Sequence, residues 1–174
     1  RTTYMLKRGA DYRETFDRFR WEIPDYYNIA IDVCDRHADD RSRRALVYQD
    51  EDTGEVTEYT FHQLKRLSDG LAASLRALGV EEGDRIGIVL AQRPETALTH
   101  LAAYKLGAIA VPIYCLFGPD ALEYRLADSG AKLVVVDDEN LHKIVQIRDG
   151  LPALKDIVVV AQKPVDGFRL FDDL

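Results

Sequence analysis

The chain has 174 residues, which suits one domain or a large subdomain, and its 47% hydrophobic and 30% charged residues are ordinary for a globular protein. A formal net charge of −7 argues against a nucleic-acid partner, because phosphate binding favours clustered Lys and Arg. No stretch approaches the ~20 apolar residues that span a bilayer, and no apolar run follows the basic N-terminus. We therefore expect no membrane span, no signal peptide and a cytoplasmic location.

The first 24 residues are polar and aromatic with no clear period, and we expect residues 1–24 to form an N-terminal arm that lies on the body of the protein. After Pro24, a helix is predicted from apolar residues at helical spacing, namely Tyr26, Ala30, Val33, Cys34 and His37. Cys34 and Cys115 have no metal-ligand spacing, and two reduced thiols are expected rather than a disulfide.

A hairpin comes next in the chain. Residues 45–49 and 55–60 have the composition of strands, and the acidic turn at residues 50–54 joins them. The pattern predicts a β-hairpin.

A long helix follows directly. Thr60 and Gln63 have the spacing of a capping box, which predicts a helix from residue 61 to about residue 78, with Gly79 as its stop. Its predicted apolar stripe consists of Leu64, Leu67, Leu71, Leu75 and Leu78.

Strands and helices alternate from Asp84 onward. Apolar strand-like runs occur at residues 86–90, 109–113, 133–136 and 157–160, and helical segments at 94–106, 119–127 and 139–148 separate them. Apolar strands that alternate with helices predict a parallel sheet covered on both faces. The expected fold class is α/β: a layered, mainly parallel sheet with helices on both faces and an attached β-hairpin.

General catalytic motifs are missing from the sequence. There is no GxGxxG loop, no GxxxxGK[ST] loop and no GxSxG elbow. The four histidines, His37, His62, His100 and His142, are isolated, which favours packing or surface roles over ligation. The acidic run at residues 137–139 offers a cation site, but acidic residues at a helix start also complement the helix dipole, and that interpretation is preferred.

Several segments in fixed order carry a resemblance to a known family. Residues 59–64 resemble a short signature near the start of adenylate-forming enzymes, and residues 78–86 resemble their Leu-Gly-x-x-x-Gly-Asp-x-Val segment. Residues 104–113 resemble the Lys-x-Gly-Ala-x-x-x-Pro motif of the same superfamily, and the resemblance covers about residues 25–161. The stretch at residues 23–34 is similar to the medium-chain acyl-CoA synthetase branch, with the acetyl-CoA synthetase branch close behind.

The chain is thus identified as an N-terminal portion of an AMP-forming acyl-CoA synthetase, with an arm at 1–24 and an α/β subdomain at 25–174. The resemblance implies that the whole enzyme uses ATP and Mg²⁺ to activate a carboxylic acid as an acyl-adenylate, then transfers the acyl group to coenzyme A, as in fatty acid metabolism. The family's phosphate loop, roughly Thr-Ser-Gly-Thr-Thr-Gly-x-Pro-Lys, is expected after Leu174. We therefore expect no catalytic residue, no tightly held cofactor and no adenylating activity in this fragment.

The resemblance also implies a coenzyme A contact. The segment near the family's coenzyme A channel consists here of Tyr114, Cys115, Leu116, Phe117 and Gly118. His142 and Val145 align with two arginines that help hold the coenzyme's phosphates in the acetate-type branch, and of the two only His142 can donate a hydrogen bond. Packing is the alternative role for each residue, and architecture is the preferred interpretation of the family-like segments.

Two other functions stay open. One is a stand-alone, non-catalytic module that binds coenzyme A or a protein. The other is a portion of a different adenylating enzyme, such as an aryl-acid ligase, a luciferase-like oxygenase or a peptide-synthetase module. Because later segments are expected to cover the strand at 157–160, we also predict exposed apolar surface there and self-association of the fragment.

Overall fold

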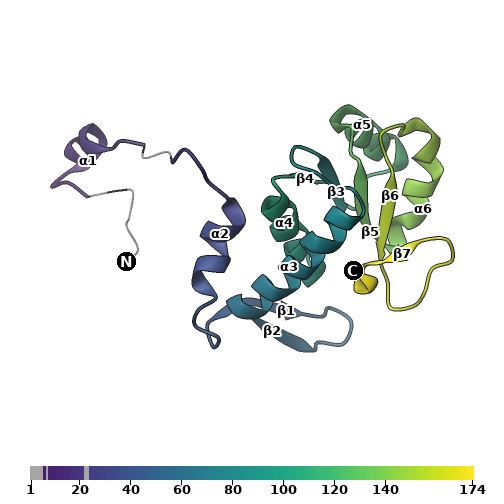
Figure 1. Cartoon of the computed structure of the whole chain (residues 1–174), viewed down its shortest axis with the longest axis horizontal. Coiled ribbons are helices and arrows are strands. Elements are labelled where there is room, and N and C mark those ends of the chain that lie inside the picture. The colour runs from purple at the N-terminus through teal and green to yellow at the C-terminus, as the bar shows by residue number, and fades with distance from the viewer. Residues whose placement is uncertain (1–5, 7, 22–23) are drawn as a thin grey trace.

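A computed structural model describes residues 6, 8–21 and 24–174, and a five-stranded parallel sheet forms its centre (Figure 1). The strand order is β4-β3-β5-β6-β7, and every neighbouring pair is parallel. The strands are β3 (Arg85–Val89), β4 (Ile109–Pro112), β5 (Leu133–Asp137), β6 (Asp156–Val160) and β7 (Arg169–Leu170). The predicted α/β class is confirmed.

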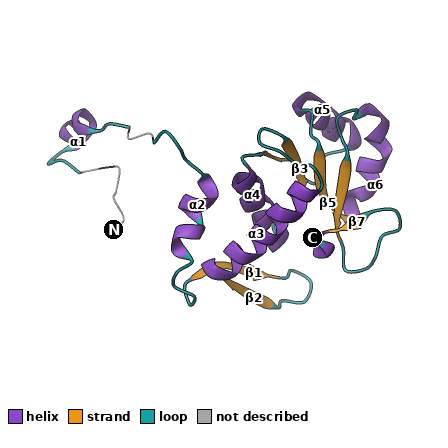
Figure 2. Ribbon diagram, viewed as in Figure 1, coloured by secondary structure: helices purple, strands orange, loops and turns teal. Residues whose placement is uncertain are grey.

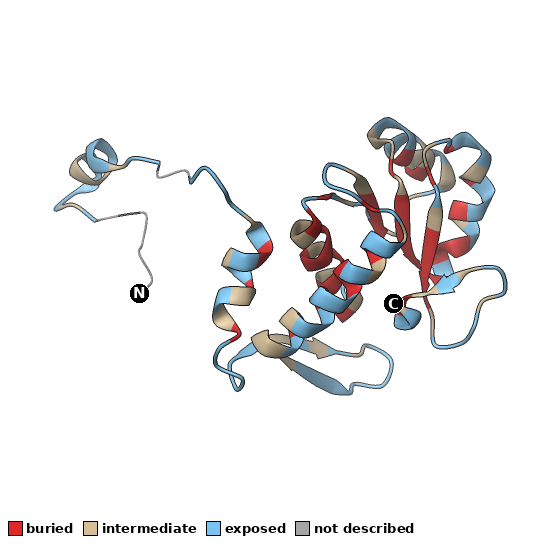
Figure 3. Cartoon of the chain, viewed as in Figure 1, coloured by how far each residue is buried: buried red, intermediate tan, exposed pale blue. Residues whose placement is uncertain are grey.

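Helices cover both faces of the sheet, because successive strand residues point to opposite sides. Leu133 and Val135 of β5 pack in one apolar cluster with α3 (Phe61–Ala77) and α4 (Pro94–Leu106). Val134 and Val136 pack in a second cluster with α5 (Pro119–Ser129) and α6 (Asp138–Ile147). Figure 3 shows the buried strands between the two helical layers.

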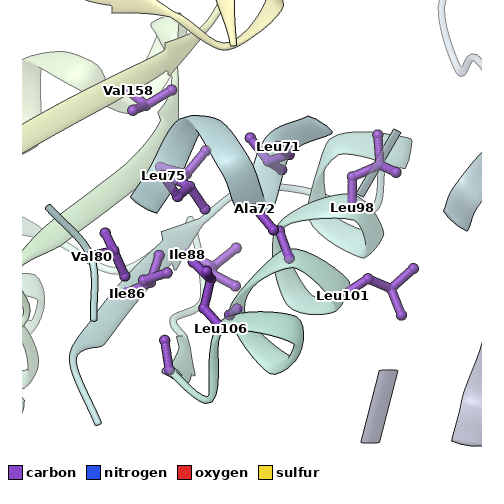
Figure 4. Packing of buried hydrophobic residues seen from close by; sticks show 14 of the residues in the cluster. Leu71, Ala72, Leu75, Val80, Ile86, Ile88, Leu98, Leu101, Leu106 and Val158 are labelled. Carbon is purple, nitrogen blue, oxygen red and sulfur yellow. The ribbon is translucent and has the colours of Figure 1, made fainter. Parts of the chain in front are cut away.

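Leucine, isoleucine and valine side chains fill the first of these clusters. Figure 4 shows residues of this cluster from three elements: Leu71 and Leu75 of α3, Leu98 and Leu101 of α4, and Ile86 and Ile88 of β3. Burying one such side chain contributes roughly 1.5–3 kcal/mol, so this layer supplies much of the stability of the body.

The start of α3 confirms the predicted capping box. The Thr60 hydroxyl accepts from the Gln63 N–H at 3.2 Å, and the Gln63 side chain accepts from the Thr60 N–H at 2.8 Å. The predicted apolar stripe is wrong at Leu67, which is 44% exposed. Ser68 is buried instead, and its hydroxyl donates to the Leu64 carbonyl at 2.7 Å. Leu67 lies on the flank of the buried face, beside a hollow of about 420 Å³.

The hairpin and the segments before it lie at the edge of the body (Figure 2). Strands β1 (Arg44–Gln49) and β2 (Val56–Thr60) pair antiparallel, as predicted. The helix predicted after Pro24 is short: α2 (Ile29–Val33) ends where Cys34 leaves helical geometry, and a 3-10 turn (Asp35–His37) follows.

The N-terminal segment contains a helix that the sequence did not predict. Helix α1 (Tyr12–Arg18) has no buried residue, and Figure 1 shows it apart from the body. The expectation that the arm lies on the body is therefore wrong for α1. No helix in the described part of the chain has both the length and the apolar character needed to cross a membrane.

The expected exposure of the strand at 157–160 is also wrong. Ile157, Val158, Val159 and Val160 are all buried. Strand β7 pairs with Val158 and Val159, and the buried ring of Phe171, in a 3-10 turn (Phe171–Asp173), joins the same apolar cluster as Val158. The chain covers this edge itself with its last residues, which removes the reason given for self-association.

Two of the family-like segments have structural roles. Gly107 ends α4 in the left-handed conformation, with φ 68°, and Lys105, two residues earlier, forms ion pairs with Asp35 at 2.9 Å and Asp69 at 2.5 Å. In the segment before β3, Asp84 pairs with Lys132 at 2.6 Å. These contacts join separate elements of the fold.

Candidate functional site

The carboxyl ends of β3, β4 and β5 lie at one edge of the sheet. The chain places β4 on one side of β3 and then β5 on the other. Helix α4, which connects β3 to β4, packs on one face, and α5, which connects β4 to β5, packs on the other. In open α/β sheets, ligands bind beyond the carboxyl ends of the strands, where the strand order reverses. This edge is therefore the candidate site.

The β4–α5 turn, residues 114–118, contains five of the six residues predicted to contact coenzyme A. The Phe117 N–H donates to the Tyr114 carbonyl at 3.1 Å, and the two rings meet edge to face with centroids 5.7 Å apart. The Arg125 guanidinium lies 4.2 Å from the Phe117 centroid, which favours a cation–π contact. Tyr114 and Leu116 are 60% and 72% exposed, whereas Cys115 is half-buried.

Gly118 ends this turn as the N-cap of α5. Its φ of −72° is open to any residue, and a Cβ there would meet nothing within 4 Å. The geometry at this position therefore does not require glycine.

Helix α6 reaches the turn through a lysine. Asp137, the N-cap of α6, accepts from the Asn140 N–H at 2.8 Å and from the Asn140 side-chain amide at 2.7 Å. The Lys143 ammonium donates to the side-chain oxygen of Asn140 at 2.6 Å and to the backbone carbonyl of Cys115 at 3.0 Å. A continuous set of hydrogen bonds thus joins the end of β5 to the β4–α5 turn.

His142 is exposed on α6 and has a local partner. Its Nδ1 lies 2.8 Å from the Glu139 carbonyl, and over the described ranges no hydrogen bond joins it to the turn. Val145, the other position aligned with an arginine, is exposed and apolar. The structure brings Cys115 and α6 together through Lys143, and it does not bring His142 into that contact.

A second cation lies after β3. Arg93 is half-buried and pairs with Glu95 at 2.8 Å. Burial alone lowers the pKa of the Arg93 guanidinium, but the hydrogen bond and charge of Glu95 outweigh it, with Tyr48 and Asp137 acting in the same direction, and the pKa is raised overall. Arg93 therefore stays charged, and it lines a cavity of about 250 Å³ between the hairpin and α4.

A larger hollow lies elsewhere. A cavity of about 520 Å³ sits at the amino end of β6, lined by residues that include Arg148, Lys155 and Arg169. We place the candidate site at the carboxyl edge because the strand topology and the polar contacts converge there.

The acidic run at residues 137–139 has the preferred helix-start role. The buried Asp137 caps α6, and Asp138 and Glu139 stand exposed in its first turn. Over the described ranges, no group of three or more His, Cys, Asp and Glu side chains is arranged to hold a metal ion.

Both cysteines are free thiols. Cys34 is buried, and burial, followed by the nearby charge of Asp35, raises the pKa of its thiol. Cys115 is half-buried in the β4–α5 turn, so the two thiols differ in accessibility.

Sequence reasoning missed Lys143 and Arg93. The loop that contains Arg93 follows the first strand of the predicted sheet, and its place at a carboxyl end was a usable signal. Lys143 lacked such a signal, because a lysine on an amphipathic helix ordinarily faces solvent.

The AMP-binding enzyme family matches the chain over residues 34–173. Among curated proteins, the acetyl-coenzyme A synthetase of Bacillus subtilis is 35% identical over 93% of this chain, and that of Xanthobacter autotrophicus is 33% identical over 80%. The chain spans only 30% and 22% of these two proteins.

Solved structures give the same picture. The anthranilate CoA ligase AuaEII, in complex with anthranoyl-AMP, is 33% identical, with a TM-score of 0.76 over 87% of this chain and 28% of its own. An acyl-CoA synthetase from Brucella canis is 30% identical, with a TM-score of 0.74 over 83% of this chain and 26% of its own.

Proposed function

Because the chain belongs to the AMP-binding enzyme family, we propose that it is the N-terminal part of an AMP-forming acyl-CoA synthetase. The whole enzyme would convert a carboxylic acid, ATP and coenzyme A to acyl-CoA, AMP and pyrophosphate through an acyl-adenylate. A carboxylate is a poor electrophile, and transfer to AMP supplies a good leaving group. The observation that carries the proposal is the family match over residues 34–173.

The residues of this chain indicate which steps of that reaction they would not perform. The 174 residues contain no Ser/Thr/Gly phosphate loop ending in lysine. We propose that ATP and Mg²⁺ are bound by residues outside this chain and that residues 1–174 alone do not form an adenylate. Residues 25–174 would act as an α/β subdomain, residues 1–24 as an arm, and the enzyme would work in the cytoplasm.

The coenzyme A contact is proposed at the β4–α5 turn, residues 114–118, with His142 nearby on α6. The turn has a defined shape and presents Tyr114 and Leu116 to solvent. The half-buried Lys143 supplies a cation beside it, which suits a coenzyme that carries phosphates.

Two observations keep other functions in view. The relatives include acetyl-coenzyme A synthetases and an anthranilate CoA ligase, so an aryl acid remains an alternative substrate to a short or medium-chain fatty acid. The buried β6 and its partner β7 give the body a closed core, which favours an alternative stand-alone module that binds coenzyme A or a protein.

Sequencing the natural gene past codon 174 tests the proposal. We expect the reading frame to continue into a Ser/Thr/Gly-rich loop that ends near a lysine, and the full gene product to release pyrophosphate from ATP when acetate or another acid and coenzyme A are added. Residues 1–174 alone should release none. A stop codon directly after Leu174 would contradict the proposal and favour the binding module.

A further inference from the structure

The β4–α5 turn is held from two sides, and the two contacts differ in kind. Arg125, an exposed residue of α5, lies over the Phe117 ring and restrains one side chain. Lys143, half-buried on α6, donates to the backbone carbonyl of Cys115 at 3.0 Å. Only the second contact fixes the path of the main chain, because a bond to a carbonyl constrains the peptide plane.

The position of Lys143 is itself fixed by buried groups. Asp137 is 6% exposed, stands at the end of β5 and accepts two hydrogen bonds from Asn140. Asn140 is also buried, and its side-chain oxygen Oδ1 accepts a hydrogen bond from the Lys143 ammonium at 2.6 Å. The amide is thereby held in one orientation, and the ammonium is held at a set place relative to β5.

Lys143 also keeps an unbalanced charge. Within the described residues it forms no ion pair with a carboxylate, and its two acceptors are neutral oxygens. An ammonium has three N–H donors, and these two bonds use two of them. The charge and the third donor are available to an anionic or carbonyl-bearing ligand at the turn.

We propose that Lys143 is the positioning residue of this site, which couples the β4–α5 turn to β5 and sets the backbone shape that the turn presents to coenzyme A. The identity of the ligand rests on the proposed function, whereas the coupling rests on the hydrogen bonds alone. His142, the residue suggested by alignment, has its Nδ1 beside the carbonyl of Glu139 and has no part in this coupling.

The first test uses the two free cysteines of the 174-residue chain as reporters. Cys115 lies in the turn, and the buried Cys34 reports on the fold as a whole. Alkylation by iodoacetamide is followed at each thiol by mass spectrometry in the wild type, Lys143→Met, Lys143→Arg and the control Lys163→Met, which alters an exposed lysine after β6.

We expect Lys143→Met to speed alkylation of Cys115 relative to Cys34 about ten-fold, the size that follows from loss of one charge-assisted hydrogen bond. Lys143→Arg should keep the wild-type rate, because a guanidinium can donate to both oxygens, and Lys163→Met should not change it. An unchanged Cys115 rate in Lys143→Met overturns the coupling. An equal rise at both thiols also overturns it, since that result means loss of the whole fold.

The second test measures coenzyme A binding to the same four proteins by titration calorimetry, at concentrations that detect weak binding, since this fragment is not expected to hold a cofactor tightly. Affinity should fall about ten-fold in Lys143→Met and return in Lys143→Arg. Faster alkylation with unchanged affinity would overturn the positioning role while leaving the proposed function intact. Faster alkylation in a chain whose wild type does not bind coenzyme A would contradict the proposed coenzyme site and support the coupling.

Discussion

Two lysines, one near the amino ends and one near the carboxyl ends of the parallel strands, make different kinds of contact. Lys105, at the end of α4, is 11% exposed at its side chain and pairs with the carboxylates of Asp35 and Asp69. Lys143, on α6, meets only the neutral oxygens of Asn140 and Cys115 in the described part of the chain. The first charge is neutralised within the protein, and the second is not.

The contacts of the two lysines distinguish a residue that holds the fold together from a residue of the candidate site. Lys105 and Gly107 belong to the segment that resembles the family's Lys-x-Gly-Ala motif, and they lie where α4 turns into β4 at the amino edge. The ion pairs of Lys105 join the 3-10 turn after α2 to α3 and α4. Lys143 lies outside the quoted motifs and points at the carboxyl edge. The motif residues identify the fold, whereas Lys143, which no quoted motif contains, is the residue that we propose positions the site.

The largest expected effect contrasts the two lysines directly. Lys105→Met removes the more buried of the two lysines that pair with Asp35 and Asp69, leaves Lys65 as their partner, and should lower the free energy of unfolding by about 2 kcal/mol. Lys143→Met removes hydrogen bonds to neutral groups at an edge and should cost less than about 1.5 kcal/mol. Urea unfolding of both variants, with Lys163→Met as the control, measures the difference. Equal losses would remove the distinction between architecture and site.

Glycine substitutions sharpen the contrast at the amino edge. Gly107→Ala forces a side chain into φ 68° and places its Cβ 3.0 Å from Glu82, so we expect a loss of about 1–2 kcal/mol. Gly70→Ala makes the same chemical change inside α3, where a Cβ meets nothing within 4 Å, and should instead stabilise by roughly 0.5–1 kcal/mol. Thermal denaturation of the pair checks the opposite signs, and a shared sign would show that φ does not govern the response.

The capping box of α3 should give an effect of about 1 kcal/mol. Thr60→Ala removes the acceptor for the Gln63 N–H, which is then left to water. Thr60→Ser retains the hydroxyl and should stay near the wild-type midpoint in urea. A loss in Thr60→Ser as large as in Thr60→Ala would assign the effect to the methyl group.

The smallest expected effect is the change in the stability contribution of Asp69 at acidic pH. Burial alone raises the pKa of Asp69, but hydrogen bonds from Lys105 and Lys65 outweigh it and lower the pKa below its ordinary value. A lowered folded-state pKa contributes stability that is present above the unfolded value of about 3.9 and is lost as pH falls through the folded pKa. The stability gap between wild type and Asp69→Asn should therefore shrink below about pH 4 in pH-dependent melting. A constant gap would show that the ion pairs do not set the pKa.

The fold was largely predictable because its signals are local and repeated. Apolar runs alternate with helical segments, and Thr60, Gln63 and Gly107 mark helix ends by backbone chemistry that does not depend on distant residues. Strand β7 has two residues and no period, and its existence depends on pairing with β6. Leu67 was predicted to be buried and is exposed, whereas Ser68 is buried. The two residues are adjacent on the helix, and which of them faces the core depends on the elements that pack against α3.

The candidate site was only partly predictable. The β4–α5 turn was indicated by the family resemblance, but its partner on α6 was not, because Lys143 and Cys115 meet only after α5 and β5 bring them together. The alignment instead indicated His142, one residue away. A shift of one residue turns a helical side chain by about 100°, so His142 and Lys143 lie on different faces of α6.

Strand β3 lies between β4 and β5, which both follow it in the chain, and this order affects how the sheet assembles during translation. As the chain leaves the ribosome, β4 is the first partner available, and the other edge of β3 waits for β5 until α5 has also emerged. At roughly 5–20 residues per second this open edge persists for seconds. The sheet is thus built outward from an inner strand, and the two-residue β7 joins β6 after the other strands have been made.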